Sequence, residues 1–129
     1  MKKSISISES EWIVMKTIWG ESSKTLPEIL NSLKHTGWST TTIQTYLARL
    51  VKKGALSTQR QGKGYLYSPR LSETDCQISE GKDFLNRVYN GSLSQMVRGF
   101  VKSGNLSAEE WKELKALVEE QEKTDGDSI

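Results

Sequence analysis

The sequence has one cysteine, one histidine and no long apolar run, and these absences exclude several classes of protein. Cys76 has no second cysteine with which to form an internal disulfide, so a disulfide-stabilised secreted domain is excluded. The mean hydropathy is −0.56, and no apolar run approaches the length of about 18 residues that a membrane span needs. The first residues also lack the apolar core of a secretion signal. We therefore expect a cytoplasmic protein without membrane insertion.

Side chains that carry catalysis or bind metals are equally scarce. His35 has no neighbouring Cys or His in the sequence, and Cys76 alone cannot form a thiolate site for copper or zinc. We find neither a nucleophile paired with a base nor a glycine-rich loop for phosphates. The acids Glu109, Glu110 and Glu113 fit a solvated helix face. The sequence therefore predicts no enzyme, no cofactor and no metal site.

The chain has the size and composition of a small globular protein. Its 129 residues suit one compact unit, or one small domain with an attached oligomerisation element. They are too few for a doubly wound nucleotide-binding enzyme. Four Trp and four Tyr argue against disorder.

The charges are distributed unevenly along the chain. Residues 1–70 carry eleven Lys and Arg against four Glu, which gives +7. Residues 71–129 carry seven Lys and Arg against twelve Asp and Glu, which gives −5 and a net charge of +2. A basic half can bind a polyanion, so we expect the two halves to have different roles.

Three helix starts are visible in the basic half. Ser8 to Glu11 and Thr25 to Glu28 have the spacing of capping boxes, in which a hydroxyl and a carboxylate each accept from a backbone N–H. We expect Ser39 to cap the third helix. The three helices are expected to end near Gly20, Gly37 and Gly54.

The third helix has two contrasting faces at helical spacing. The apolar face, expected to pack inward, consists of Ile43, Tyr46, Leu47, Leu50 and Val51. The opposite face is polar and cationic and consists of Thr41, Gln44, Thr45, Ala48, Arg49 and Lys52. After Gly54 the pattern changes. Residues 56–60 and 65–68 predict two short strands, and residues 61–64, with two glycines, predict the loop of a β-hairpin.

Three helices followed by a hairpin predict a winged helix-turn-helix, with residues 36–38 as the turn. A face of small polar residues, amides and cations can enter the DNA major groove, where Gln reads adenine and Arg reads guanine. We predict base readout by Thr41, Gln44, Thr45 and Arg49. We predict phosphate contacts by Lys52, Lys53, Arg60 and Lys63. The same pattern occurs in protein-interaction folds, so pattern alone leaves that function open.

The acidic half predicts three further helices, which begin at Ser72, Ser92 and Ser107. Three helices in about 50 residues bury too little surface to be stable alone, so we expect them to pack against a second copy of the chain. Packing against the first domain is the alternative. The predicted dimer interface consists of Phe84, Val88, Leu93, Met96, Val97, Phe100, Val101, Trp111, Leu114 and Leu117.

Taken together, these patterns predict a mainly α protein with a small β-hairpin. Residues 1–70 are expected to form a winged helix-turn-helix DNA-binding domain, and residues 71–121 a three-helix dimerisation domain. Residues 122–129 are polar and contain an Asp-Gly-Asp run, so we expect a flexible acidic tail.

A set of residues in both halves points to one known family. These residues are Glu11 to Met15, Ile18-Trp19, Trp38-Ser39, Thr42 to Thr45, Arg49-Leu50, Lys52 to Gly54, Phe84, Val88 to Gly91, Val97, Phe100-Val101, Leu106-Ser107 and Glu110 to Leu114. Over about residues 5–120 the chain resembles the penicillinase-repressor family, the repressors of β-lactamase and methicillin-resistance genes. The resemblance implies a homodimer that represses transcription from a two-fold operator, with the C-terminal helices as its interface. It also implies that Thr42 belongs to the base contacts, although its helical angle fits a phosphate contact equally.

The resemblance further implies induction by proteolysis, in which a membrane sensor responds to a β-lactam and a regulatory protease is a partner. Family members are cut between Asn and Phe in the fifth helix, and the aligned bond here, Gly99–Phe100, is the candidate cleavage site. This chain lacks that Asn, and it has Gln44 and Thr41 where the family has Arg and Lys, so its operator is expected to differ. Copper-responsive relatives carry paired Cys-x-Cys motifs that are absent here. Control of another regulon, without metal sensing, is the alternative.

Overall fold

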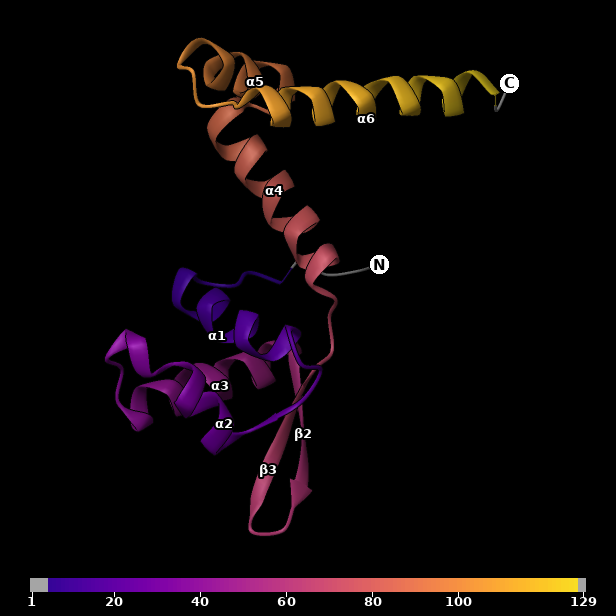
Figure 1. Ribbon diagram of the computed structural model, residues 1–129. Coiled ribbons are helices and arrows are strands. Elements are labelled where there is room, and N and C mark those ends of the chain that lie inside the picture. Colours follow the sequence, from indigo (N-terminus) through magenta and orange to yellow (C-terminus); the bar gives the residue numbers. More distant parts are fainter. Residues whose placement is uncertain (1–4, 128–129) are drawn as a thin grey trace. The chain divides into compact units, whose positions relative to one another are not determined.

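A computed structural model describes residues 5–127 (Figure 1). The chain divides between Gly81 and Lys82 into two compact units. We expected the first domain to end at residue 70, but the first unit continues into the following helix. The reason is that Cys76 is buried in the first unit's core. Burial raises the pKa of the Cys76 thiol, with Asp75 adding to the effect, so this side chain packs as a small apolar group.

The first unit contains the predicted three helices and hairpin. Its elements in chain order are α1 Glu9–Trp19, β1 Lys24–Thr25, α2 Leu26–Ser32, the 3₁₀ helix η1 Lys34–Thr36, α3 Thr40–Lys53, β2 Leu56–Gln61 and β3 Gly64–Pro69. Both capping boxes are confirmed. The Ser8 N–H donates to Glu11 Oε1 over 2.9 Å, and the Thr25 N–H donates to Glu28 Oε1 over 2.9 Å. The Ser39 hydroxyl caps α3 as expected.

The β-structure is a three-stranded antiparallel sheet with the order β1-β3-β2, whereas the sequence predicted only a hairpin. The additional strand pairs Lys24 with Tyr67 and Thr25 with Leu66. Two residues are too short to show an alternating pattern, so only the position of β3 beside them defines this strand. The hairpin is also tighter than expected, because Gln61 pairs with Gly64. Its loop is reduced to two residues, the first of which, Gly62, has a positive φ of 61° that suits such a turn.

The core lies between the three helices and the root of the sheet. Val14, Met15 and Ile18 of α1 lie in one cluster with Ile29 of α2 and with Leu33, which follows α2. The other buried members of the cluster are Ile7, Ile43, Leu47, Leu50, Ala55, Leu56 and Cys76. At its edge, the Trp19 indole N–H donates to the Leu71 carbonyl over 2.9 Å. This bond ties the C-terminal end of α1 to the segment that leads into the next helix.

One ion pair joins the start of α1 to the end of α3. Glu11 is 1% exposed, and its Oε1 lies 2.5 Å from Lys53 Nζ. Lys53 Nζ also donates to the Ser6 carbonyl over 2.8 Å. Burial by itself raises the pKa of the Glu11 carboxyl, but hydrogen bonds from Lys53 and Ser8 outweigh burial and hold this pKa below its usual 4.5. Glu11 is therefore buried as a charged, satisfied group.

The remaining helices are α4 Glu73–Tyr89, α5 Leu93–Lys102 and α6 Ala108–Asp127. Their predicted starts are confirmed, because the hydroxyls of Ser72, Ser92 and Ser107 each accept from a backbone N–H three residues later. The expected flexible tail is wrong through Asp127, because α6 continues to that residue. A hydrogen bond of 3.1 Å from Gln121 Nε2 to Asp125 Oδ1, one turn apart, supports the added turns. Residues 128 and 129 of the predicted tail lie outside the described residues.

The buried ion pair between Glu11 and Lys53 predicts that replacing Lys53 and replacing the adjacent Lys52 will have different effects on stability. Lys53→Met should lower the free energy of unfolding by about 3 kcal/mol at neutral pH, because it leaves the Glu11 carboxylate buried without its partner. Lys52→Met, at an exposed position next to it, should change stability by less than about 0.5 kcal/mol. Urea unfolding followed by circular dichroism measures both.

The stability difference between wild type and Lys53→Met should depend on pH, because the pKa of Glu11 is lowered in the folded protein. A group whose folded-state pKa is lowered contributes stability above its unfolded value, and this contribution disappears as pH falls through the folded value. The gap between wild type and Lys53→Met should therefore narrow as pH falls from 7 to 3, because protonation of Glu11 removes the charge that Lys53 neutralises. A gap that does not change between pH 7 and pH 3 would contradict the charged pair.

Candidate nucleic-acid interface

The basic half contains a long stretch without any acidic residue. No Asp or Glu occurs between Glu28 and Glu73, and seven Lys and Arg occur in the same stretch. The stretch covers most of α2, the turn, α3 and the hairpin of β2 and β3. The chain segment that forms the predicted interface therefore carries no negative side chain. A polyanion such as DNA would not be repelled by any residue of this segment.

Helix α3 has the two faces that the sequence predicted. Ile43, Leu47 and Leu50 are fully buried against the core. The opposite face is exposed and presents Thr41, Gln44, Thr45, Ala48, Arg49 and Lys52. Since one side of α3 is anchored over its length, the other side is held as a rigid, polar ridge.

The hydroxyls of two threonines of α3, Thr42 and Thr45, form local hydrogen bonds. Thr42 is half-buried, and its hydroxyl accepts from the Ser39 hydroxyl over 3.0 Å while its N–H donates to the same oxygen over 3.1 Å. The Thr45 hydroxyl donates to the Thr41 carbonyl over 3.0 Å. The position of Thr42 is thus at the cap of α3, at the shoulder of the exposed face. This geometry favours the phosphate alternative for Thr42 over base readout.

Gln44 and Arg49 are the long polar side chains of this face. Both are exposed, and neither has a hydrogen-bond or ion-pair partner within residues 5–127. An amide carries both a donor and an acceptor, and a guanidinium carries a fork of donors. The two side chains are therefore free to bind an external partner with directional hydrogen bonds.

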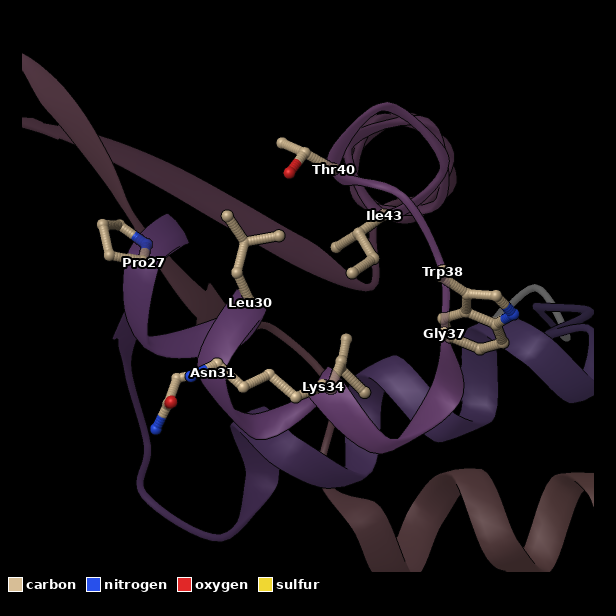
Figure 2. Close-up of a pocket in the computed structure, with 9 residues that line it drawn as sticks. Pro27, Leu30, Asn31, Lys34, Gly37, Trp38, Thr40 and Ile43 are labelled. Atoms are coloured by element: carbon tan, nitrogen blue, oxygen red, sulfur yellow. The ribbon is translucent and has the colours of Figure 1, made fainter.

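The turn between α2 and α3 is fixed by a left-handed residue and an aromatic contact. Gly37 has φ +75°, a conformation that favours glycine. The Trp38 ring packs edge-on against Tyr46 with ring centroids 5.1 Å apart. Beside this turn lies an open groove of about 570 Å³. Figure 2 shows its lining, which comes from α2, the turn and the start of α3.

Sequence reasoning missed the polar rim of this groove. Asn31 and Lys34 line it from the second helical segment, and Thr40 lines it from the first turn of α3. The available signal was that all three are polar residues close in sequence to the predicted turn. The predicted site lacked them because the distance between α2 and α3 is set by tertiary packing.

The predicted phosphate-binding lysines and arginines do not share one environment. Lys52, Arg60 and Lys63 are exposed. Lys53 instead donates hydrogen bonds to Glu11 and to the Ser6 carbonyl, so its ammonium is already paired within the first unit. The ion pair makes Lys53 less available than the other three for a phosphate, and its phosphate contact stays a prediction. The sequence could not show this ion pair, because Glu11 lies 42 residues before Lys53 and no local spacing relates the two.

The second unit presents a different kind of surface. Within residues 82–126 no side chain is buried. Phe84, Val88, Leu93, Phe100, Val101, Trp111 and Leu117 are between 39% and 62% exposed. Met96, Val97 and Leu114 are half-buried. The apolar residues of the predicted interface are thus left largely uncovered by a single chain, which is unusual for side chains of this size.

Two other kinds of site were searched for among the described residues. No group of three or more His, Cys, Asp and Glu side chains in residues 5–127 is arranged to hold a metal ion. None of the helices in this part of the chain is both long and apolar enough to cross a membrane. Gly99 and Phe100, the candidate cleavage site, lie inside α5 and are both exposed.

A three-helix core, a helix-turn-helix and a β-wing define this chain as a winged-helix protein. The penicillinase repressor family model matches residues 7–120, and the chain belongs to this family.

Individual relatives agree with this assignment. The chain is 45% identical to the penicillinase repressor of Bacillus licheniformis, over 93% of this chain and 94% of that protein. It is 32% identical to the methicillin resistance regulatory protein MecI of Staphylococcus aureus strain N315, over 90% of this chain and 95% of that protein. It is also similar to the solution structure of monomeric Bacillus licheniformis BlaI in complex with the blaP half-operator. The identity is 46% and the TM-score 0.51, covering 58% of this chain and 93% of that structure.

Proposed function

We propose that this protein is a transcriptional repressor that binds double-stranded operator DNA in a sequence-specific manner. The observation that carries the proposal is the exposed face of α3, where Gln44 and Arg49 have no partner within the described residues. The similar BlaI structure contains half-operator DNA, which supports the same role for this fold. The protein acts by binding and not by catalysis, and its place of action is the cytoplasm, where its operator lies.

The dimensions of α3 suit the major groove. An α-helix with its side chains is about 10–12 Å across, and the major groove is about 12 Å wide. Gln44 lies in the second turn of α3, in the part of a recognition helix that contacts base edges. Its amide can bond the N6 and N7 of adenine, and Arg49 can bond the O6 and N7 of guanine. Thr41 and Thr45 contribute methyl groups that can contact thymine.

Exposed cations around α3 position the helix on the duplex. Lys52 lies at the C-terminal end of α3, and Lys63 lies in the two-residue loop at the tip of the hairpin. Lys34 adds a further cation and Asn31 an amide at the groove beside the turn, toward α2. These groups contribute affinity without reading sequence. Thr42 joins them through its place at the cap of α3.

The protein acts as a homodimer through its second unit. Three helices with no buried side chain in residues 82–126 lack a core of their own. A second copy would cover the exposed apolar residues of α4, α5 and α6. Two recognition helices related by a two-fold axis would then bind two half-sites, which accounts for a palindromic operator.

The regulated genes are those of antibiotic resistance or cell-wall stress. This part of the proposal rests on relatives that are named a penicillinase repressor and a methicillin resistance regulatory protein. Cleavage by a regulatory protease at Gly99–Phe100 stays a prediction for the release of repression. Both residues are exposed, but the bond lies within the helix α5, which must open locally before a protease can bind it.

Selection from a pool of random duplexes tests the proposed function. A single palindromic consensus with half-sites about one or two helical turns apart is expected. Gln44→Ala should weaken binding to this site by about 1–3 kcal/mol and binding to random DNA much less. Gln77→Ala, an exposed residue of α4, serves as the control. If no consensus emerges, the protein is not a sequence-specific repressor, and if Gln44→Ala weakens all duplexes equally, Gln44 does not read bases.

The salt dependence tests the phosphate contacts. A dimer that neutralises about 6–10 phosphates should lose roughly 10³–10⁵-fold in affinity between 50 and 200 mM salt. Lys63→Ala should reduce the slope of log affinity against log salt, and Lys112→Ala, an exposed cation of α6, should leave it unchanged. Fluorescence anisotropy with the selected duplex gives these slopes. An affinity independent of salt would contradict the proposed contacts.

The oligomeric state tests the second unit. Light scattering at micromolar protein should give twice the chain mass of 14.5 kDa. Met96→Asp should shift the protein to monomer and weaken binding to the full operator, because a charge would be buried at the interface. Gln95→Asp, which adds the same charge on the opposite side of α5, should stay dimeric. A wild-type monomer would refute the homodimer.

A further inference from the structure

The connection between α4 and α5 contains an asparagine that is followed directly by a glycine. Helix α4 ends at Tyr89 and α5 begins at Leu93, so Asn90 and Gly91 lie in the turn between the two helices. Both residues are exposed. The turn belongs to the second unit and has no part in the proposed DNA interface.

The chemistry of an Asn-Gly pair is that of a slow, spontaneous modification. The backbone nitrogen of the second residue can attack the side-chain amide carbon of the asparagine and close a ring. Glycine allows this attack best, because it has no side chain beside its nitrogen and its backbone is the least restricted. The other asparagines of the chain, Asn31, Asn86 and Asn105, are followed by serine, arginine and leucine. Asn90 is therefore the asparagine with the least steric protection.

The folded turn holds the attacking nitrogen in a hydrogen bond. Asn90 has φ +52° and Gly91 has φ +85°, so two successive left-handed residues end α4. In this conformation the Gly91 N–H donates to the Leu85 carbonyl over 3.0 Å, and the Ser92 N–H donates to the Tyr89 carbonyl over 2.9 Å. The nitrogen attacks only after it has lost its proton, and a hydrogen-bonded N–H loses its proton far less readily than a free one. The closed turn therefore protects Asn90, and opening the end of α4 makes it reactive.

A single chain gives this turn little support. No side chain within residues 82–126 is buried. Val88, in the last turn of α4, is 49% exposed, and Leu93, at the start of α5, is 57% exposed. A helix end without buried contacts opens at a low cost in free energy. A second copy of the chain that covers Val88 and Leu93, one on each side of the turn, would raise this cost.

We propose that Asn90 is a site of spontaneous deamidation whose rate is set by assembly of the second unit. The Gly91 nitrogen gives up its proton and attacks Asn90 Cγ, and the side-chain nitrogen leaves with that proton as ammonia. Water then opens the resulting succinimide at either of its carbonyl carbons, which leaves aspartate or isoaspartate. The two steps together consume one water molecule and release one ammonia. The role of assembly rests on the proposed homodimer, whereas the reaction itself does not.

The products weaken the assembly that protects the turn. Either product adds a carboxylate at the C-terminal end of α4, where the helix dipole disfavours negative charge. Isoaspartate also lengthens the main chain between α4 and α5 by one carbon atom, which disturbs the turn in which Gly91 bonds Leu85. Chains that stay unpaired are thereby modified first and lost from the pool that can dimerise.

Prolonged incubation of the full-length protein in mildly alkaline buffer tests the site. Intact-protein mass spectrometry detects the conversion of an amide to an acid, and peptide mapping locates it and separates aspartate from isoaspartate. We expect both products at Asn90 well before any change at Asn31, Asn86 or Asn105. Equal rates at the four asparagines, or an unmodified Asn90, would overturn the proposal.

Two comparisons test the role of assembly. Wild-type protein should react at Asn90 roughly 10-fold faster when it is diluted to the monomer than at a concentration where light scattering shows the dimer. Met96→Asp should react at the monomer rate at every concentration, and Gln95→Asp, its matched control, should behave as wild type. Circular dichroism checks that both variants keep their helices, and the dilution of wild type needs no variant. Equal rates in monomer and dimer would show that assembly does not set the rate.

Asn90→Asp supplies the first product directly. Because each chain of the dimer contributes one such helix end, this variant should raise the dissociation constant of the dimer by about threefold to tenfold. Asn90→Gly keeps a residue suited to positive φ and removes the amide, so it should stay dimeric and unmodified. An Asn90→Asp dimer as tight as wild type would refute the effect on assembly.

These outcomes are separable from those of the proposed function. A missing DNA consensus would remove the repressor function and leave the deamidation of Asn90 standing. A wild-type monomer at all concentrations would overturn the role of assembly together with the proposed homodimer.

Discussion

The burial of one side of α3 is the constraint on which the rest of the first unit depends. Ile43, Leu47 and Leu50 are buried in the core, where α3 packs against α1 and β2, so the opposite side must face outward and cannot rotate. The Glu11–Lys53 pair fixes the end of the same helix to the start of α1. A recognition surface needs this rigidity, because each hydrogen bond to a base requires its side chain at a defined position.

The second unit is organised by the opposite principle. Its helices α5 and α6 are capped by Ser92 and Ser107, yet no side chain of residues 82–126 is buried. Local hydrogen bonds define the helices, and the apolar area that would stabilise their packing is left for a partner. Repression by such a molecule would depend on protein concentration. Only the dimer contacts both half-sites of the operator at once, so tight binding requires that two chains associate.

The structure differs from the sequence predictions mainly where distant residues meet. Lys53 looked like any other cation at the end of a basic helix, and only the fold brings Glu11 to it. Strand β1 has two residues and becomes a strand only beside β3. The boundary between the units moved from residue 70 to Gly81 because Cys76 reaches the core. The end of α6 was missed for a local reason: its last turns contain glycine and aspartate, which suggested a tail, although the helix continues to Asp127.

The sequence by itself determined the helix starts, the two faces of α3 and the hairpin, because capping and periodicity act between residues a few positions apart. It also indicated the class of protein, through the helix-turn-helix pattern, the basic first half and the family resemblance over about residues 5–120. Only the tertiary structure decided which cations remain free, that Asn31 and Lys34 line a groove, and that Lys24 and Thr25 form a strand beside β3. These facts depend on packing and register, which join residues that no local spacing relates.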